Sequence, residues 1–345
     1  MNCILLYEYS LTYDQVYNML CYAIEEPPSD ANDKRTYKFP FISSEAFSIS
    51  VPSIIDMFFD ESNDKLLRKL LSFIESEPEL NPVLAGYFGK VFNSLINKKR
   101  LQLLSYILID NRKYIEKLIG HMYNQSIADS LSLLLKLDTE SEIFHKEIKE
   151  CSVSILDSIY NSSPKNNLYL DLVRNSFSVL STLPQTSNST EFATSESFIM
   201  KIYESIENNE IILKEALKYL ITIMKMKINS NISPTEESDI IPIDCSYIIK
   251  GALNNMENYK EVLEEKKEIF GRVRLVIIEW FQFLLKLRDE TVIKKASELK
   301  FPQTLLYLLN EYSMNSNLHL FIYRIFNDAI TSNNKHLLNT VCLWL

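Results

Sequence analysis

Residues 77–99 read EPELNPVLAGYFGKVFNSLINKK, and this stretch decides the fold class. Asn81 followed by Pro82 is a strong helix start, because Asn accepts free amide hydrogens and proline fits the first helical position. Apolar residues then recur with helical spacing from Val83 to Leu95, over about four turns. The stretch therefore predicts an amphipathic helix that buries one face.

Helical spacing of apolar residues continues through most of the chain. It is found over residues 101–108, 114–122, 127–137, 143–160, 168–183, 198–207, 211–226, 247–263, 270–287, 292–299, 305–312, 318–330 and 336–343. The 345 residues include only five glycines, whereas sheet turns and nucleotide-binding loops depend on glycine. We therefore expect an all-α fold, an α-α superhelix of HEAT- or armadillo-like repeats, rather than a Rossmann domain, a TIM barrel or a β-sandwich.

We expect this helical repeat to form a single domain over residues 1–345. Prolines at 27, 28, 40 and 52 exclude one continuous helix there, so an irregular, proline-containing connection is expected at 26–52. Polar segments with prolines predict loops at 184–195 and 229–243. Helical pairs resume on both sides of each loop, so neither loop has to be a domain boundary.

Composition and charge argue against several classes of function. The chain has 36 Lys and Arg against 45 Asp and Glu, a net charge of −9, and no strongly basic run, so a nucleic-acid partner is not expected. No segment approaches the ~18 consecutive apolar residues of a membrane span, and no signal-peptide pattern is present. Five scattered cysteines without a C-x-x-C pair predict reduced thiols in a cytosolic protein.

One glycine-containing segment faintly resembles a phosphate-binding loop. Gly86, Gly89 and Lys90 lack the earlier glycine and the following Ser or Thr of the full pattern. They also lie inside the predicted helix, where small residues more often permit close helix packing. The four histidines are too dispersed in the sequence for an adjacent metal site, so we expect no catalytic residue, no metal and no cofactor.

An acidic cluster offers a different enzymatic alternative. Asp60, Glu61 and Asp64 resemble the aspartate-rich magnesium motif of all-α diphosphate-utilising enzymes, because carboxylates on one helix face can share a hard cation. No second acidic motif follows in the sequence. A position before a helix, where negative charge is favourable, is the simpler interpretation.

The segment from Glu25 to Pro40 carries charges and aromatics that core packing does not explain. Its candidate partner-binding residues are Asp33, Lys34, Arg35, Tyr37 and Lys38. Two interpretations stand side by side at this point. The segment is a solvated loop whose aromatics seal the end of the helical stack, or it is a contact for a partner.

At this segment the chain resembles the SAPS-domain family, the phosphatase-associated regulatory subunits of protein phosphatase 6. The resemblance begins with Glu26 and the double proline at 27–28, followed by the K-R-x-Y-K-x-P run at 34–40. It is strongest at 77–99, which follows the family's E-P-P-L-N-P-L-L-A pattern in order and spacing. Residues 271–285 and 301–330 resemble the late helices of the family.

The chain also departs from the family pattern. The spacing from His121 to the leucine triplet at 133–135 is stretched, and Ser132 stands where the family usually has Asp. The family usually has an acidic leader and another helix upstream, and a long polar tail downstream. A shortened sequence would explain both of these last differences.

The resemblance implies a non-catalytic scaffold that binds the catalytic subunit of a protein phosphatase 6-type Ser/Thr phosphatase and directs its substrate choice or location. It leaves room for a further ankyrin-type or other regulatory subunit, and it implies a cytoplasmic location, with nuclear location also open. The alternative is a helical-repeat adaptor in transport or membrane traffic without a phosphatase partner. Beyond the five candidates at 33–38, the resemblance adds Asn81, Lys90, Arg272, Arg274, Asn317 and His319.

Overall fold

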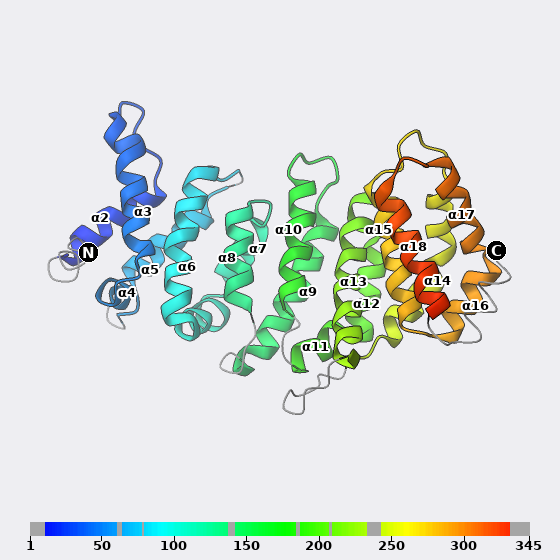
Figure 1. Ribbon diagram of the computed structural model, residues 1–345. Helices are drawn as coiled ribbons and strands as arrows, with labels where there is room; N and C mark the ends of the chain where they lie inside the picture. Colours follow the sequence, from blue (N-terminus) through cyan, green and yellow to red (C-terminus); the bar gives the residue numbers. More distant parts are fainter. Residues whose placement is uncertain are drawn as a thin grey trace. The chain divides into compact units, whose positions relative to one another are not determined.

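The structure, a computed structural model, describes residues 11–60, 64–77, 79–136, 142–183, 187–206, 209–232 and 243–331. Within these ranges the chain forms helices and no strand (Figure 1). The predicted all-α, helical-repeat class is therefore confirmed. The chain divides into two compact units, residues 1–185 and 186–345. A single domain over residues 1–345 stays a prediction.

Unit 1 is built around one long central helix, α6, which packs against α2, α3, α4 and α8, while α8 contacts α10 in turn. The described elements of unit 1 are α2 (Tyr13–Ile24), η1 (Lys34–Lys38), α3 (Phe39–Ser48), α4 (Pro52–Phe58), α5 (Lys65–Leu71), η2 (Ser72–Glu75), α6 (Pro82–Leu104), η3 (Ser105–Asp110), α7 (Lys113–Gly120), α8 (Gln125–Leu135), η4 (Glu142–Phe144), α9 (His145–Asn161) and α10 (Tyr169–Thr182).

Helix α6 begins where the sequence predicted. The Asn81 Oδ1 atom accepts hydrogen bonds from the amides of Val83 and Leu84, at 2.9 and 3.3 Å, and Pro82 occupies the first turn. The helix is kinked at Lys99, whose backbone is not helical (φ −140°, ψ 41°). The kink lies between the two predicted helical segments, of which the first ends at Leu95 and the second begins at residue 101.

Aromatic rings and a close helix contact fill the core of unit 1. Phe88 stacks on Phe73 and Phe92, with ring centroids 5.3 and 5.2 Å apart. A Cβ atom added at Gly89 would lie 3.4 Å from the hydroxyl of Ser130 in α8. Gly89 therefore permits close packing of α6 on α8, as predicted for a glycine inside this helix.

Unit 2 contains a layer in which α15 packs between α13 and α18, and α14 contacts α12, α15, α16 and α17. The described elements are α11 (Ser187–Ala193), α12 (Glu196–Ile206), α13 (Glu210–Ile232), α14 (Ser246–Glu264), α15 (Arg272–Lys286), α16 (Glu290–Glu298), α17 (Phe301–Glu311) and α18 (Ser316–Thr331).

Aromatic pairs join the helices of unit 2. The Tyr259 ring of α14 meets Trp280 of α15 edge to face at 5.0 Å between centroids. Phe281 of α15 stacks on Phe301 of α17 at 4.2 Å. Such pairs contribute about 1 kcal/mol beyond the apolar area they bury. They therefore fix how α14 and α17 pack on α15.

Four expectations from the sequence need correction or fall outside the described residues. The connection at 26–52 is mostly helical, because Pro40 lies in the first turn of α3, where proline costs no hydrogen bond. The predicted loop at 184–195 contains α11, and the predicted loop at 229–243 begins inside α13. Residues 233–242 and the predicted helix at 336–343 lie outside the described residues.

The described residues contain neither a single helix that fits a membrane span nor a cluster of metal ligands. No single helix among them is both long and apolar enough to cross a membrane; one pair, Lys34–Ser48 with Pro52–Phe58, meets the length and composition test only when joined across a 100° bend. No group of three or more His, Cys, Asp or Glu side chains in the described part of the chain is arranged to hold a metal ion.

Candidate functional site

The candidate residues at 33–38 lie at the tip of a helical hairpin, which we call the docking arm: α2, η1, α3 and the connection at 25–33. Asn32 starts the second limb by accepting the Arg35 and Thr36 amides through its carbonyl oxygen, at 2.9 and 3.0 Å. One π-helical turn follows, in which the amide of Phe39 donates to the Lys34 carbonyl. The chain then continues directly into α3.

Arg35 connects the tip of the arm to its first limb. Its Nη2 atom donates to the Glu25 carbonyl at 3.4 Å, and its guanidinium carbon lies 5.0 Å from the centroid of the Tyr22 ring. Tyr22 in turn packs on Phe39 at 5.4 Å between ring centroids. Arg35 is half-buried by these contacts, so at least part of its role is to hold the hairpin together.

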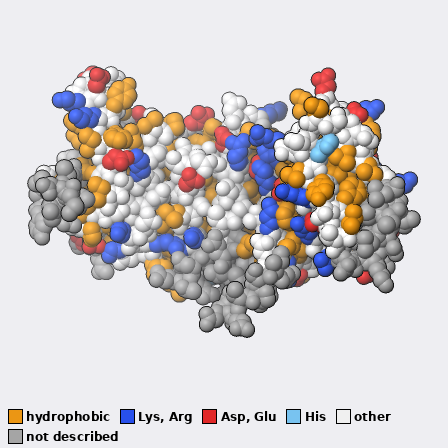
Figure 2. All heavy atoms as spheres, in the orientation of Figure 1, with side chains coloured by type: hydrophobic (Ala, Val, Ile, Leu, Met, Phe, Trp, Pro, Cys, Tyr) orange, Lys and Arg blue, Asp and Glu red, His pale blue; other side chains and the backbone are white. Residues whose placement is uncertain are grey.

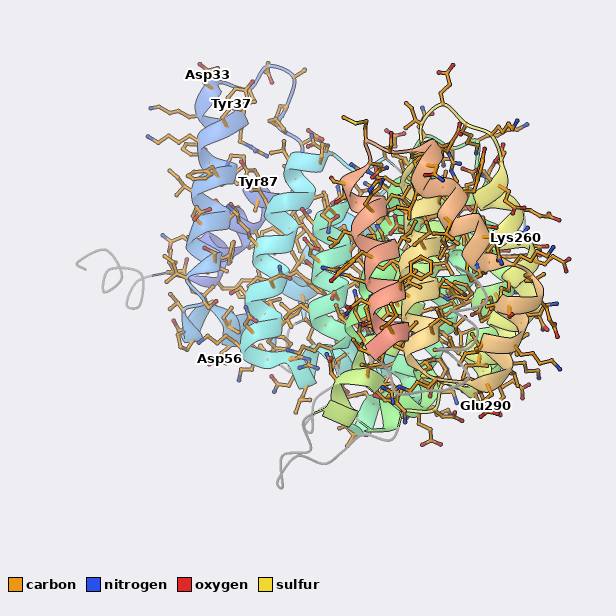
Figure 3. All side chains as sticks on the ribbon, turned by 45° about the vertical axis from the view of Figure 1, so that its right-hand side comes forward. Asp33, Tyr37, Asp56, Tyr87, Lys260 and Glu290 are labelled. Carbon is orange, nitrogen blue, oxygen red and sulfur yellow. The ribbon has the colours of Figure 1, made fainter. Side chains whose placement is uncertain are left out.

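The outer face of the arm exposes large apolar side chains next to charges. Tyr37 is 70% exposed and Phe41 is 51% exposed. Further exposed side chains of the arm are Asp33, Lys34, Lys38, Ile42 and Ile49. Figure 3 shows Asp33 and Tyr37 near the tip of the arm, and Figure 2 shows hydrophobic and basic side chains gathered over α3. Apolar surface of this kind, bordered by charges, is typical of a protein-interaction site.

Lys90 joins α6 to this surface. Its ammonium group forms an ion pair with Glu45 of α3 and lies 5.5 and 5.9 Å from the ring centroids of Phe41 and Tyr87. Both members of the pair stay partly exposed, so the pair itself contributes little to stability. Its main consequence is to hold Lys90 beside the exposed Phe41 ring.

Asn81 has structural partners for both ends of its side chain. Besides capping α6, its Nδ2 atom donates to Glu26 Oε1 of the docking arm at 2.8 Å. Next to it, Lys69 of α5 pairs with Glu25 at 2.5 Å. These polar contacts fasten the end of α2 to the rest of unit 1, which gives Asn81 a positioning role.

Arg274 needs the clearest correction among the predicted partner-binding residues. It is only 2% exposed, and its guanidinium group donates to the carbonyls of Phe270, Ile269 and Glu265 at 2.6, 2.7 and 3.1 Å. The guanidinium carbon also lies 5.2 Å from the Tyr312 ring centroid. Arg274 therefore holds the segment before α15 in place and is not part of an exposed surface.

The other candidates in unit 2 lie on α15 and α18. Arg272 and Asn317 are exposed, whereas His319 is half-buried. The Nε2 atom of His319 is buried and has no hydrogen-bond partner among the described residues. These residues belong to unit 2, while the docking arm belongs to unit 1, so they form a second group.

Among the described residues, the acidic cluster forms no cation site. Asp64 precedes α5, as predicted, but its side chain makes no capping bond and instead accepts from Arg68 Nε at 2.5 Å and from the Tyr106 hydroxyl at 3.3 Å. Asp60 has an interaction of its own, and Glu61 lies outside the described residues. The Asp64 side chain is thus held by polar contacts with Arg68 of α5 and Tyr106 of η3.

Sequence reasoning missed the apolar half of the arm surface, namely Phe41, Ile42 and Ile49. Phe41 and Ile42 follow Pro40 directly, and a helix that starts at a proline would have placed Ile42 and Ile49 on one face, seven residues apart. The signal was present, but four prolines in one segment were interpreted as irregular structure.

These features define the class of protein: a helical-repeat protein whose candidate site is an exposed protein-interaction surface. No family model matches the chain. It is 25% identical over 349 residues to "Serine/threonine-protein phosphatase 6 regulatory subunit 3" of Gallus gallus, which covers 91% of this chain and 40% of that protein. It is 22% identical over 348 residues to regulatory subunit 1 of Homo sapiens, covering 87% and 39%.

A shorter region shows higher identity. Over 117 residues the chain is 34% identical to phosphatase 6 regulatory subunit 1 of Mus musculus, covering 34% of this chain and 13% of that protein. The chain thus spans about two fifths of the length of the first two relatives. The predicted resemblance is confirmed: this chain is a homologue of proteins named as regulatory subunits of protein phosphatase 6.

One comparison with solved structures adds a weak likeness. The crystal structure of SYS-1 aligns with 95% of this chain and with 58% of the SYS-1 chain. The identity is 12% and the TM-score is 0.47. The fold class given above rests on the helices and their packing.

Proposed function

We propose that this chain is a non-catalytic regulatory subunit that binds the catalytic subunit of a protein phosphatase 6-type Ser/Thr phosphatase and directs its substrate choice or location. The observation that carries the proposal is the similarity, over 91% of the chain, to a protein named as such a subunit. The relative is more than twice as long, so the activity and the partners of the whole protein are part of the proposal.

The docking arm is the surface we assign to the catalytic subunit. Tyr37 and Phe41 are rigid aromatic side chains that would bury large apolar area on binding, as interface anchors do. Lys34, Lys38 and Lys90 border them and would supply charged contacts at the rim. The arm is held by Arg35, Asn81 and Lys69, so little ordering would be needed on association.

A binding measurement with purified proteins tests this assignment. Immobilised chain is titrated with phosphatase 6 catalytic subunit, and Tyr37→Ala combined with Phe41→Ala is expected to weaken binding about tenfold or more. The matched control combines Tyr160→Ala with Ile143→Ala, because these side chains are 72% and 78% exposed in the same unit but lie outside the arm. The control should bind as the unchanged chain does.

Three outcomes would count against the proposal. If the unchanged chain does not bind the catalytic subunit, the phosphatase role is wrong, and an adaptor in transport or membrane traffic becomes the better hypothesis. If both double variants bind normally, or lose affinity equally, the arm is not the contact surface. Circular dichroism of each variant confirms that the chain has folded.

We extend the proposal in two directions that rest on the resemblance alone. A further regulatory subunit, of ankyrin type or another kind, would join the same complex, which mass spectrometry of proteins co-purified with the chain would reveal. The chain would be cytoplasmic, with a nuclear fraction, as microscopy of the tagged protein in its native cell would test.

A further inference from the structure

A concentration of positive charge marks the layer formed by α13, α15 and α18 in unit 2. The sequences of these three helices contain eight Lys and Arg but only four Asp and Glu, although the whole chain has a net charge of −9. Since α15 packs between the other two helices, these charges belong to one continuous layer. Figure 2 shows Lys and Arg side chains gathered over α13 and α15.

Helical spacing places the cations on one side of this layer. Residues three, four or seven apart share a helix face, and ion pairs join the faces of neighbouring helices. Lys225 of α13 contacts Glu279 of α15, and Lys286 of α15 contacts Asp328 of α18, each at 3.2 Å between nitrogen and oxygen. We call the following residues the cationic face: Lys214, Lys218, Lys225, Arg272, Lys286 and Arg324.

The carboxylates of α13 and α15 lie deeper than the lysines they hold. Glu215 is 5% exposed and lies 2.8 Å from Lys214 and 3.1 Å from Lys218, whose own side chain is half exposed. Glu279 is likewise less exposed than its partner Lys225. In these pairs of α13 and α15 the acid therefore fixes the position of the lysine while the more exposed charge is positive; in the pair of Lys286 with Asp328 of α18 the two side chains are similarly exposed.

Aromatic rings of α15 and α18 form cation–π contacts with three cations of this face. The Phe283 ring centroid lies 4.8 Å from Lys225 Nζ and 5.4 Å from Lys286 Nζ. The guanidinium of Arg324 lies 5.8 Å from the Phe321 ring centroid. Cationic groups held over ring faces are already ordered, which reduces the entropy lost when a ligand binds.

Two arginines of the face are available for a new partner. Arg272 and Arg324 are exposed, and neither pairs with a carboxylate among the described residues. A guanidinium group can bind a carboxylate through two parallel hydrogen bonds. We propose that the cationic face binds an extended acidic segment of another protein, rich in Asp and Glu.

The spacing of the helices favours a peptide over other anions. Packed helix axes lie about 8–10 Å apart, and an extended chain advances about 3.3 Å per residue. An acidic residue at every third position would therefore meet cations on successive helices. Phosphates along one strand of a nucleic acid repeat more closely than this, and the acids between the lysines would repel a continuous anionic surface such as a membrane.

A peptide-binding assay on the full chain, without any phosphatase, tests the proposal. Fluorescence anisotropy follows a labelled 12-residue peptide (about 40 Å extended) with Glu at every third position among Ser and Gly, and the same peptide with Gln. The Glu peptide should bind with an affinity that falls as salt rises, and the Gln peptide should not bind. Arg272→Glu with Arg324→Glu should weaken binding about tenfold or more.

The matched control combines Lys98→Glu with Lys294→Glu, which changes net charge equally at exposed positions of α6 and α16 outside the face. Its affinity for the Glu peptide should stay within about twofold of the unchanged chain. The proposal is overturned if the Glu peptide does not bind, if the control loses as much affinity as the arginine variant, or if single-stranded DNA or anionic vesicles of equal charge bind more tightly. Thermal melts show that both variants fold.

Discussion

Gly251 has less room for a side chain than Gly271, the other glycine of unit 2. A Cβ atom added to this glycine of α14 would lie 2.1 Å from Cε2 of Tyr203 in α12. The Tyr203 ring has no room to move away, because it is buried and its hydroxyl donates to the Ile248 carbonyl at 3.0 Å. Gly251→Ala should lower the free energy of unfolding by about 1–3 kcal/mol, measured by chemical denaturation.

Gly120 supplies the matching control in another helix. Nothing lies within 4 Å of a Cβ atom added there, at the end of α7. Gly120→Ala should leave stability unchanged or raise it by up to about 1 kcal/mol, because alanine loses less backbone entropy in a helix. Equal destabilisation by the two replacements would show that the contact with Tyr203 is not the cause.

His121 should make unit 1 sensitive to acid. Its Nε2–H donates to the Ile74 carbonyl at 3.0 Å, so in the neutral ring Nδ1 accepts from the Tyr123 hydroxyl at 3.2 Å, and that hydroxyl accepts from the Leu80 amide at 2.9 Å. Burial lowers the pKa of His121 from its ordinary value of 6.5. The folded state therefore binds a proton less readily than the unfolded state.

The direction of the pH effect follows from that difference. Stability should be full above about pH 6.5 and should fall as the pH drops from there to the folded-state pKa, because the unfolded chain takes up the proton first. Chemical denaturation at about pH 7 and about pH 5 measures the loss. His121→Gln should be less stable at neutral pH but should lose less on acidification, and an unchanged pH dependence in this variant would contradict the assignment.

At the scale of elements, Arg274 fixes how α15 begins. It satisfies three carbonyls of the preceding segment, and a lysine cannot reproduce that planar arrangement of donors. Arg274→Lys should cost about 2 kcal/mol of unfolding free energy, whereas Arg272→Lys at the exposed start of the same helix should cost almost nothing. An Arg274→Lys protein that keeps its melting temperature but loses partner binding would restore the residue to the interaction surface.

The elements also show what sequence could and could not predict. Helices with a clear polar cap were predicted correctly, as for Asn81 at α6, because capping and periodicity are local properties of the chain. Helix α3 of the docking arm was missed, because Pro40 was interpreted as a helix breaker although a proline also fits the first turn of a helix. The burial of Arg274 could not be predicted, since its partners are backbone carbonyls that a loop brings together.

At the scale of the whole molecule, the division into two units predicts separate folding. Each unit has its own network of contacts and its own aromatic core, around Phe88 in one and Trp280 in the other. Fragments 1–185 and 186–345 should each show helical circular dichroism and a cooperative thermal transition. A fragment that stays unfolded under conditions in which the full chain is folded would contradict this division and favour a single domain.

The same scale explains why partner surfaces were only partly predictable. The sequence pointed to the tip of the docking arm through charges and aromatics that lacked a core role. Of the cationic face it named only Arg272, because the cations on α13, α15 and α18 are far apart in the chain, and only helix packing gathers them.

The π-helical turn η1 sets the rotation of the tip of the docking arm about its helix axis, relative to α3. One additional residue in a helical turn rotates everything on its outer side by about 100° relative to a continuous α-helix. Removing Thr36 should therefore turn Lys34 and Arg35 around the limb axis relative to Phe41. Partner affinity should change, and the melting temperature should fall only by what the lost contacts of Arg35 with Glu25 and Tyr22 contribute. Gain or loss of a single residue in η1 can thus change which side chains of the tip face a partner.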